Sequence, residues 1–309
     1  MTAVWIILAA LLAVVLLGTV LFLIACRRGP VPDLTKPEVI AKWGRAEQTE
    51  EILAGVRLMQ DAENIFLPSY DGLRLHGRLL QQPGAKGTIL LFHGYRSSWV
   101  IDFSIVLPYY FTLGYNLLAV DERAHSESEG TYITFGVRER MDVISWATYM
   151  GQKLGPDAPL ILGGLSMGAT TVLMASCFDF PANVRAIIAD CGFTSPYEIA
   201  KSVLRRDYPR LPVGLLLPIC GLFTRLYAGF GLHDASTLDA VRESRYPILF
   251  IHGTGDTFVP CEMTKEAYAA CTSEKERVLV DGAEHGKSYL VEKDRVEKAL
   301  CRFLAAYTE

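Results

Sequence analysis

Short apolar runs alternate with amphipathic stretches along most of the chain after residue 60. The runs that predict strands are 88–92, 116–120, 160–163, 186–189, 248–251 and 278–280. The stretches that predict helices are centred on 103–112, 137–153, 167–177, 262–270 and 294–307. Strands that alternate with helices form a largely parallel sheet covered by helices on both faces, so we expect an α/β fold.

The region before this alternation predicts an edge and a helix. Strands at 65–67 and 74–79 flank Asp71-Gly72, a pair typical of a hairpin turn, and give the sheet an antiparallel edge. Upstream, 29–37 is a short linker that contains proline, and 38–58 is predicted as a helix. This helix either docks on the domain or lies on a membrane surface, and its few Lys and Arg residues favour docking.

The segment 193–238 interrupts the alternation. It is far longer than a connection between neighbouring strands requires, and it contains Pro209, Pro212 and Pro218 and an apolar patch at 213–217. We interpret it as a small helical lid over the strand ends. The alternative is an excursion that only covers the sheet.

The amino terminus is the most apolar part of the chain. Residues 3–25 carry no charge and would form a helix about 34 Å long, enough to cross a bilayer. No Lys or Arg precedes this run, which favours a retained transmembrane helix over a cleaved signal, although the run ends at Cys26 as a lipoprotein cleavage box does. Arg27 and Arg28 follow directly and favour a cytoplasmic position for the rest of the chain.

The predicted organisation is therefore a single-pass membrane protein in three parts. A transmembrane helix at 3–25 is followed by a linker and amphipathic helix at 26–62, and then by one domain at 63–309 that carries the lid. The formal net charge is −4 without a basic cluster, so we expect no nucleic-acid partner. Seven cysteines without C-x-x-C spacing argue against a disulfide framework and a zinc site, and we expect no metal and no cofactor.

Candidate chemistry centres on Gly164-Leu165-Ser166-Met167-Gly168, which lies between a predicted strand and a predicted helix. A serine at the apex of such a strand-turn-helix is the context of a nucleophile elbow, where the glycines leave room for a strained turn. The serine needs a base, and the base needs an orienting acid. In this architecture the chain order is serine, then acid, then histidine.

His285 is the predicted base, because it follows the strand at 278–280 in a loop of small residues. His252 ends an apolar strand, as a buried structural histidine does, and His233 lies in the lid. His93 precedes Ser166, against the expected order, and is interpreted as a residue that shapes its loop.

Asp256 is the predicted acid, because its loop follows the strand at 248–251 and is rich in small residues. Asp190, at the end of 186–189, is its strongest rival. The two predicted oxyanion donors are backbone N–H groups, one from Met167 directly after the nucleophile and one from Tyr95 in the loop after 88–92.

The charged segment 121–130 follows another strand. Its spacing matches no metal loop, so we interpret it as a turn held by internal hydrogen bonds and ion pairs rather than as a metal or substrate site.

Together these motifs resemble the α/β-hydrolase superfamily over about residues 60–307. They are His93-Gly94-Tyr95, Asp121-x-Arg123-x-His125, Gly164-Leu165-Ser166-Met167-Gly168, Gly253-Thr254-Gly255-Asp256 and His285. More closely, the chain is similar to the membrane-anchored bacterial branch of the serine-aminopeptidase/monoacylglycerol-lipase-like group. The resemblance implies the α/β-hydrolase fold with an eight-stranded sheet, Ser166, Asp256 and His285 as the triad, and Tyr95 and Met167 as oxyanion donors. Ser126 departs from the family loop, where a glycine is usual, and a serine is strained there if the backbone needs a positive φ.

These residues predict a membrane-anchored serine hydrolase that cleaves carboxylic esters through an acyl-enzyme, with a small acyl compound as its substrate. The apolar lid and the membrane helix point to a lipophilic acyl group, as in a glyceride, a lysolipid or a medium-chain ester. The same machinery suits an amide, including a short peptide, or a thioester. An alternative of another class is a non-catalytic binding module on this fold.

Overall fold

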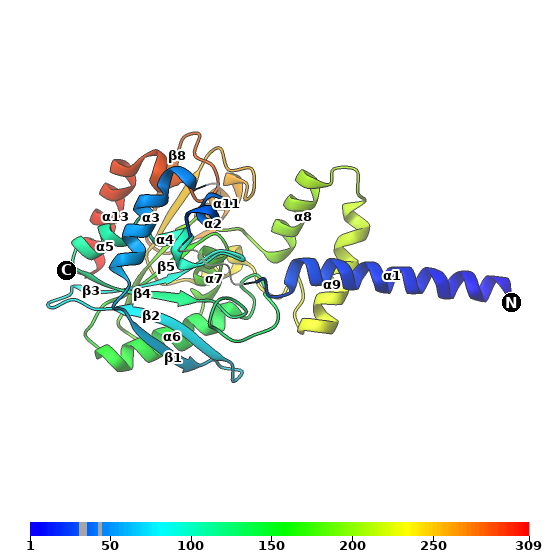
Figure 1. Cartoon of the computed structure of the whole chain (residues 1–309), viewed down its shortest axis with the longest axis horizontal. Coiled ribbons are helices and arrows are strands. Elements are labelled where there is room, and N and C mark those ends of the chain that lie inside the picture. The colour runs from blue at the N-terminus through cyan, green and yellow to red at the C-terminus, as the bar shows by residue number, and fades with distance from the viewer. Residues whose placement is uncertain (31–35, 43–44, 309) are drawn as a thin grey trace.

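The computed structural model describes residues 1–30, 36–42 and 45–308, and its centre is an eight-stranded sheet (Figure 1). The strands are β1 (Glu63–Pro68), β2 (Arg74–Leu80), β3 (Gly87–Phe92), β4 (Tyr115–Asp121), β5 (Leu160–Leu165), β6 (Val184–Asp190), β7 (Ile248–Gly253) and β8 (Lys275–Val280). Their order is β1-β2-β4-β3-β5-β6-β7-β8. The β1–β2 and β2–β4 pairs are antiparallel and the other pairs are parallel, which confirms the predicted sheet and its antiparallel edge.

Both faces of the sheet are covered by helices because the strands are apolar on both sides. In β3, Ile89 and Leu91 belong to the core on one face, and Leu90 and Phe92 belong to the core on the other. The first core is closed by α3 (Thr49–Leu58), α4 (Trp99–Phe103), α5 (Leu107–Thr112) and α13 (Lys293–Thr308). The second is closed by α6 (Glu139–Leu154), α7 (Met167–Ala175), α10 (Thr237–Glu243) and α11 (Cys261–Ala270).

The prediction of a single helix at 103–112 was wrong. The structure has α4, which ends at Phe103, and a separate α5, which begins at Leu107 with Pro108 in its first turn. Proline has no N–H to donate and is favoured at the start of a helix, so Pro108 begins a new helix instead of continuing the old one.

The prediction of one helix at 38–58 was also wrong in its continuity. The described parts are α2 (Pro37–Lys42), a 3₁₀ turn η1 (Ala46–Gln48) and α3, and positions 43 and 44 lie outside the described residues. Arg45 has a non-helical φ of −116°, and its guanidinium donates to the carbonyl of Gly286 at 2.8 Å. The segment docks on the domain as expected, since Ile40 and Ile52 are fully buried in the core.

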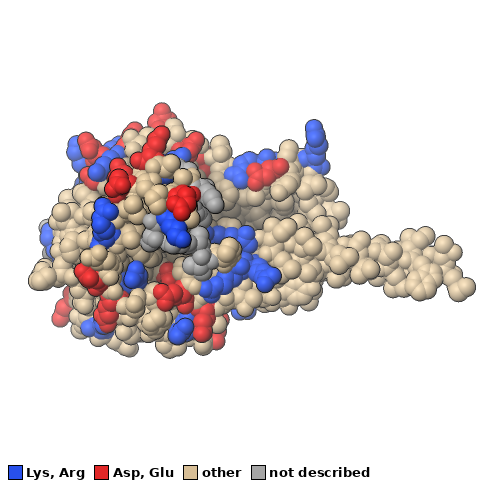
Figure 2. Space-filling model, viewed as in Figure 1, with Lys and Arg blue, Asp and Glu red and all other residues tan. Residues whose placement is uncertain are grey.

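The segment interpreted as a lid forms two helices, α8 (Pro196–Asp207) and α9 (Val213–Ala228), and then leads into α10. Beside α9 runs α1 (Thr2–Cys26), which extends away from the sheet and its covering helices (Figure 1). Among the described helices, α1 alone is long and apolar enough to cross a membrane. Residues 2–26 contain no Asp, Glu, Lys or Arg, and Figure 2 shows no charged side chain on the visible face of the projecting end of α1.

Candidate active site

Ser166 occupies a strained turn between β5 and α7. Its φ of 56° lies in the left-handed region, which is unfavourable for a residue with a side chain. The turn is possible because two glycines allow close backbone approach. A Cβ on Gly168 would overlap with the carbonyl group of Phe92, and a Cβ on Gly164 would overlap with the backbone of Gly168. The strained turn is therefore made possible by glycines that belong to the motif itself.

The structure brings the three predicted triad side chains together. His285 Nε2 lies 2.9 Å from Ser166 Oγ, and His285 Nδ1 lies 2.6 Å from Asp256 Oδ2. Asp256 follows β7 and His285 follows β8, and the carboxyl ends of parallel strands meet at one edge of a sheet. The N–H of Gly255 donates to the carbonyl of Ala283 at 3.0 Å, which joins the two loops directly.

Asp256 is fully buried and accepts four hydrogen bonds. Its Oδ1 accepts from the N–H groups of Phe258 and Val259 at 2.8 and 2.9 Å, and its Oδ2 accepts from His285 and, at 3.1 Å, from His252 Nε2. Burial raises the pKa of Asp256, but the hydrogen bonds from His252 and His285 outweigh it, so the pKa lies well below its usual range. The ionised carboxylate holds the proton of His285 on Nδ1 and leaves Nε2 free to accept another.

The rival residues lie in different surroundings. Within the described residues, no hydrogen bond joins the carboxylate of Asp190 to His285, and Asp190 Oδ1 is buried without a partner. Burial raises the pKa of Asp190 to about 6. His252 is buried and donates from Nε2 to the carbonyl of Val259, and the ring of His233 lies tilted against that of Tyr197 in the lid, with 4.5 Å between the ring centres. The geometry therefore favours Asp256 as the partner of His285.

The loop after β3, residues 93–97, passes directly over Ser166. A Cβ on Gly94 would lie 3.3 Å from Ser166 Cβ. The N–H of Gly94 donates to Asp102 Oδ2 at 2.6 Å, so a carboxylate on α4 holds this loop. The N–H of Met167 belongs to the first turn of α7, where it has no acceptor within the helix. Asp102 belongs to no motif, and sequence analysis did not find it.

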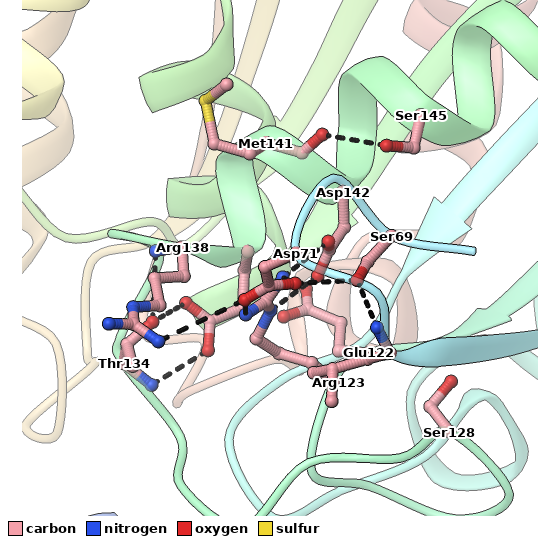
Figure 3. Close-up of polar contacts among 12 residues, drawn as sticks. Ser69, Asp71, Glu122, Arg123, Ser128, Thr134, Arg138, Met141, Asp142 and Ser145 are labelled. Carbon is pink, nitrogen blue, oxygen red and sulfur yellow. Dashed lines mark hydrogen bonds and ion pairs between the residues drawn. The ribbon is translucent and has the colours of Figure 1, made fainter. Parts of the chain in front are cut away.

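Arg123 fixes the loop at 121–130. Its guanidinium donates to Asp142 on α6 at 2.6 Å and to Asp71 in the β1–β2 turn at 2.9 and 3.1 Å (Figure 3). Ser128 Oγ adds a bond of 2.6 Å to the carbonyl of Asp121. The Ser128 bond lies within the turn, as expected, but the ion pairs of Arg123 reach residues outside it, so the expectation of internal contacts alone was wrong in part.

The same loop carries the predicted strain. Ser126 has a φ of 40°, so the position does require the left-handed backbone that a glycine adopts more easily. Its neighbour His125 is buried, and burial together with the nearby His93 lowers the pKa of His125 to about 3. The neutral ring accepts the N–H of Arg96 at 2.9 Å, which ties this loop to the loop at 93–97.

A small cavity lies behind the triad on the α4 and α13 side of the sheet. Its volume is about 60 Å³, and Leu165 and Gly286, the neighbours of Ser166 and His285, are among its lining residues. This space suits a few water molecules or a short acyl fragment, so a long acyl chain would have to lie on the other side of Ser166, toward the lid. Cys191, Asp256 and His285 form the one group of possible metal ligands found among the described residues. The Cys191 sulfur lies within 4.8 Å of the side-chain donor atoms of the other two residues.

Comparisons with known proteins agree with this architecture. A family model described as the alpha/beta hydrolase fold matches residues 87–212. The uncharacterised protein YqkD of Bacillus subtilis is 29% identical over 241 residues, which cover 77% of this chain and 77% of that protein. The lysophosphatidylserine lipase ABHD12 of Danio rerio is 29% identical over 168 residues, which cover 53% of this chain and 41% of that protein.

Among solved structures, an esterase of Pyrococcus furiosus superposes with a TM-score of 0.66 at 21% identity, covering 81% of this chain and 92% of that one. The chain has the α/β-hydrolase fold, as its motifs predicted. Its assignment to a membrane-anchored bacterial branch stays a prediction.

Proposed function

We propose that this chain is a serine hydrolase that cleaves carboxylic esters. The observation that carries the proposal is the pair of contacts from Ser166 Oγ to His285 Nε2, 2.9 Å, and from His285 Nδ1 to Asp256 Oδ2, 2.6 Å. A serine becomes a nucleophile when a neutral imidazole accepts its proton and a buried carboxylate stabilises the resulting imidazolium.

In the proposed reaction, Ser166 Oγ forms a bond to the ester carbonyl carbon as its proton passes to His285 Nε2. The N–H groups of Tyr95 and Met167 stabilise the oxyanion. The bond to the alkoxy oxygen then breaks, and His285 gives its proton to the leaving alcohol. A water molecule, deprotonated by the same nitrogen, releases the acid from Ser166 and restores the hydroxyl.

We further propose a lipophilic acyl group. Met167 lies in a buried apolar cluster with Ile199 of α8, and Tyr95, Val203 and Phe258 form its partly buried edge. The lid therefore contributes apolar side chains to the oxyanion side of Ser166. The solved esterase and the lysophosphatidylserine lipase named above support ester cleavage as the class of reaction.

Membrane attachment is the second part of the proposal. In α1 the buried residues are Gly18, Phe22 and Cys26, so residues 2–17 are free to meet lipid. Sixteen residues span about 24 Å, less than the hydrocarbon core of about 30 Å. The next turns of α1 must then also lie in the bilayer, at the level of α9, whose exposed side chains include Leu215, Leu222, Leu226 and Tyr227. Arg27 and Arg28, directly after α1, favour the cytoplasmic side for the enzyme.

The test is hydrolysis of p-nitrophenyl esters from acetyl to dodecanoyl by the full chain in detergent micelles, with Ser166→Ala as the matched control. We expect turnover that rises with acyl length and is lost in Ser166→Ala. Folded protein that hydrolyses none of these esters would overturn the proposal. Faster turnover of the matching anilides would move the function to amides.

A further inference from the structure

The carboxyl end of α1 is hydrogen-bonded to the loop that passes over Ser166. The carbonyl of Ile24 accepts from Arg96 Nη2 at 2.8 Å, that of Ala25 accepts from the Tyr95 hydroxyl at 2.8 Å, and that of Arg27 accepts from Arg96 Nη2 at 2.9 Å. Carbonyls in the last turn of a helix have no partner within the helix. The side chains of Tyr95 and Arg96 therefore cap α1.

The same end of α1 is bound to the loop at 121–130 and the residues after it. The N–H of Ile133 donates to the carbonyl of Cys26 at 2.7 Å, and the N–H of Arg28 donates to that of Thr131 at 2.9 Å. The Arg28 guanidinium donates to the carbonyls of Ser126 and Ser128. Five consecutive residues, 24 to 28, thus make polar contacts with the loop at 93–97, the loop at 121–130 or the residues directly after it, which a simple tether does not require.

Earlier turns of α1 pack against the lid. Gly18 has no room for a side chain because the ring of Phe223 lies against it, and Thr19 Oγ1 lies 3.0 Å from the hydroxyl of Tyr227. The ring of Phe22 lies 5.1 Å from that of Tyr227. One helix therefore contacts α9 with its side and the loop at 93–97 with its end (Figure 1).

The loop at 93–97 needs such support. Arg96 has a φ of 51°, in the left-handed region, and strained residues persist only where their surroundings hold them. On one side, the N–H of Gly94 is held by Asp102, and on the other the N–H of Arg96 is held by His125. Between them lies Tyr95. Its hydroxyl is bound by α1, and its ring stacks on that of Phe135 with 5.3 Å between the ring centres.

We propose that the end of α1 is part of the active site, where it holds the oxyanion loop in its catalytic conformation. Tyr95 and Arg96 act through their side chains as positioning residues, in addition to the backbone role of Tyr95. The inference rests on the proposed function, since it takes the Tyr95 N–H as an oxyanion donor. It also requires that α1 stays attached to the working protein.

The test uses the full chain in detergent micelles. Tyr95→Phe removes only the hydroxyl that binds Ala25, and Arg96→Met removes only the guanidinium. Each should lower kcat for p-nitrophenyl butyrate about ten-fold, and the double variant about a hundred-fold, with KM changed less than about two-fold, because a displaced donor weakens transition-state rather than ground-state binding.

Matched controls come from the surface. Tyr307 donates to Glu274 and Arg242 donates to Asp239, both in exposed pairs outside the described site. Tyr307→Phe and Arg242→Met should leave kcat within about two-fold of wild type. In the double variant, amide hydrogen exchange over 93–97 should be faster than in wild type and unchanged in α13, which separates loosening of the loop from general unfolding.

Three results decide the matter. A double variant with wild-type kcat overturns the positioning role, as does a fully active protein recovered from cells whose intact mass lacks residues 1–26. A kcat loss with unchanged exchange at 93–97 also overturns it. If wild type itself hydrolyses no ester, the proposed function fails. The exchange data still test the structural part of the inference, because faster exchange at 93–97 in the double variant shows that Tyr95 and Arg96 hold the loop whether or not the protein is an esterase.

Discussion

The Asp256→Asn substitution keeps the shape of the side chain, and its surroundings dictate how the amide must lie. Oδ1 accepts from two backbone N–H groups, of Phe258 and Val259, so an NH₂ group there would face two donors. The amide oxygen therefore keeps that position, and the NH₂ takes the place of Oδ2 beside His285 and His252. It donates to His285 Nδ1 and forces the ring proton onto Nε2, the nitrogen that faces the serine.

Two effects of different size follow. The wrong tautomer removes the base, and the charge that stabilises the imidazolium is lost, which in a triad lowers kcat about 10⁴-fold, or about 5.5 kcal/mol in the barrier. The effect on the free energy of unfolding is smaller. His252 Nε2 loses one acceptor but keeps the carbonyl of Val259 at 3.0 Å, so the expected loss in unfolding free energy is about 1 kcal/mol.

The assay is steady-state hydrolysis of p-nitrophenyl butyrate, with thermal unfolding to show that the variant is folded. Asp190→Asn is the matched control, because Asp190 also ends a strand at this edge of the sheet but has no hydrogen bond to His285 among the described residues. We expect it to lower kcat less than about ten-fold. A larger loss in Asp190→Asn than in Asp256→Asn would refute the reasoning and move the acid to β6.

Three more predictions concern stability and lipid. Burial raises the pKa of Asp190 to about 6 from 3.8, so the folded state binds this proton more tightly than the unfolded state does. The free energy of unfolding contributed by Asp190 therefore falls by about 3 kcal/mol as the pH rises from about 4 to 6. Measured by denaturant unfolding, the free energy of unfolding should change less with pH across this range in Asp190→Asn than in wild type. The same pH dependence in both proteins would contradict this. Ser126→Gly should relieve the left-handed φ of 40° and stabilise the fold by up to about 1 kcal/mol, seen as a higher Tm; a lower Tm argues against strain. Leu222→Asp, on the exposed side of α9, should slow hydrolysis of dodecanoyl esters in liposomes while acetyl esters are spared; equal rates on both would remove α9 from the lipid surface.

The sheet was predictable because its signal is local. A strand buried on both faces reads as a continuous apolar run, and the run at 88–92 matches β3 to within one residue at its start. The turn at Ser166 was predictable for the same reason, since the glycines that permit it are its neighbours in sequence. Helix breaks were harder, and the separate α5 depended on Pro108, whose position within an apolar run did not stand out.

Support for the site was not predictable, because it comes from residues far away in the chain. Asp102 holds Gly94 from a different helix, and Arg45 reaches Gly286 across 241 positions. The contacts of Arg28 with the loop at 121–130 depend on where α1 ends in space. Single charged residues of this kind carry no periodicity and no motif, so only the folded arrangement identifies them.

The central claim is that Ser166 is a reactive nucleophile. The most direct measurement is labelling of the full chain with a fluorophosphonate probe, followed by peptide mass spectrometry, with Ser166→Ala and His285→Ala in parallel. We predict one adduct, on the peptide that contains Ser166, with no labelling of Ser166→Ala and strongly slowed labelling of His285→Ala. Folded wild type that stays unlabelled, or an adduct that persists in Ser166→Ala, would contradict the account.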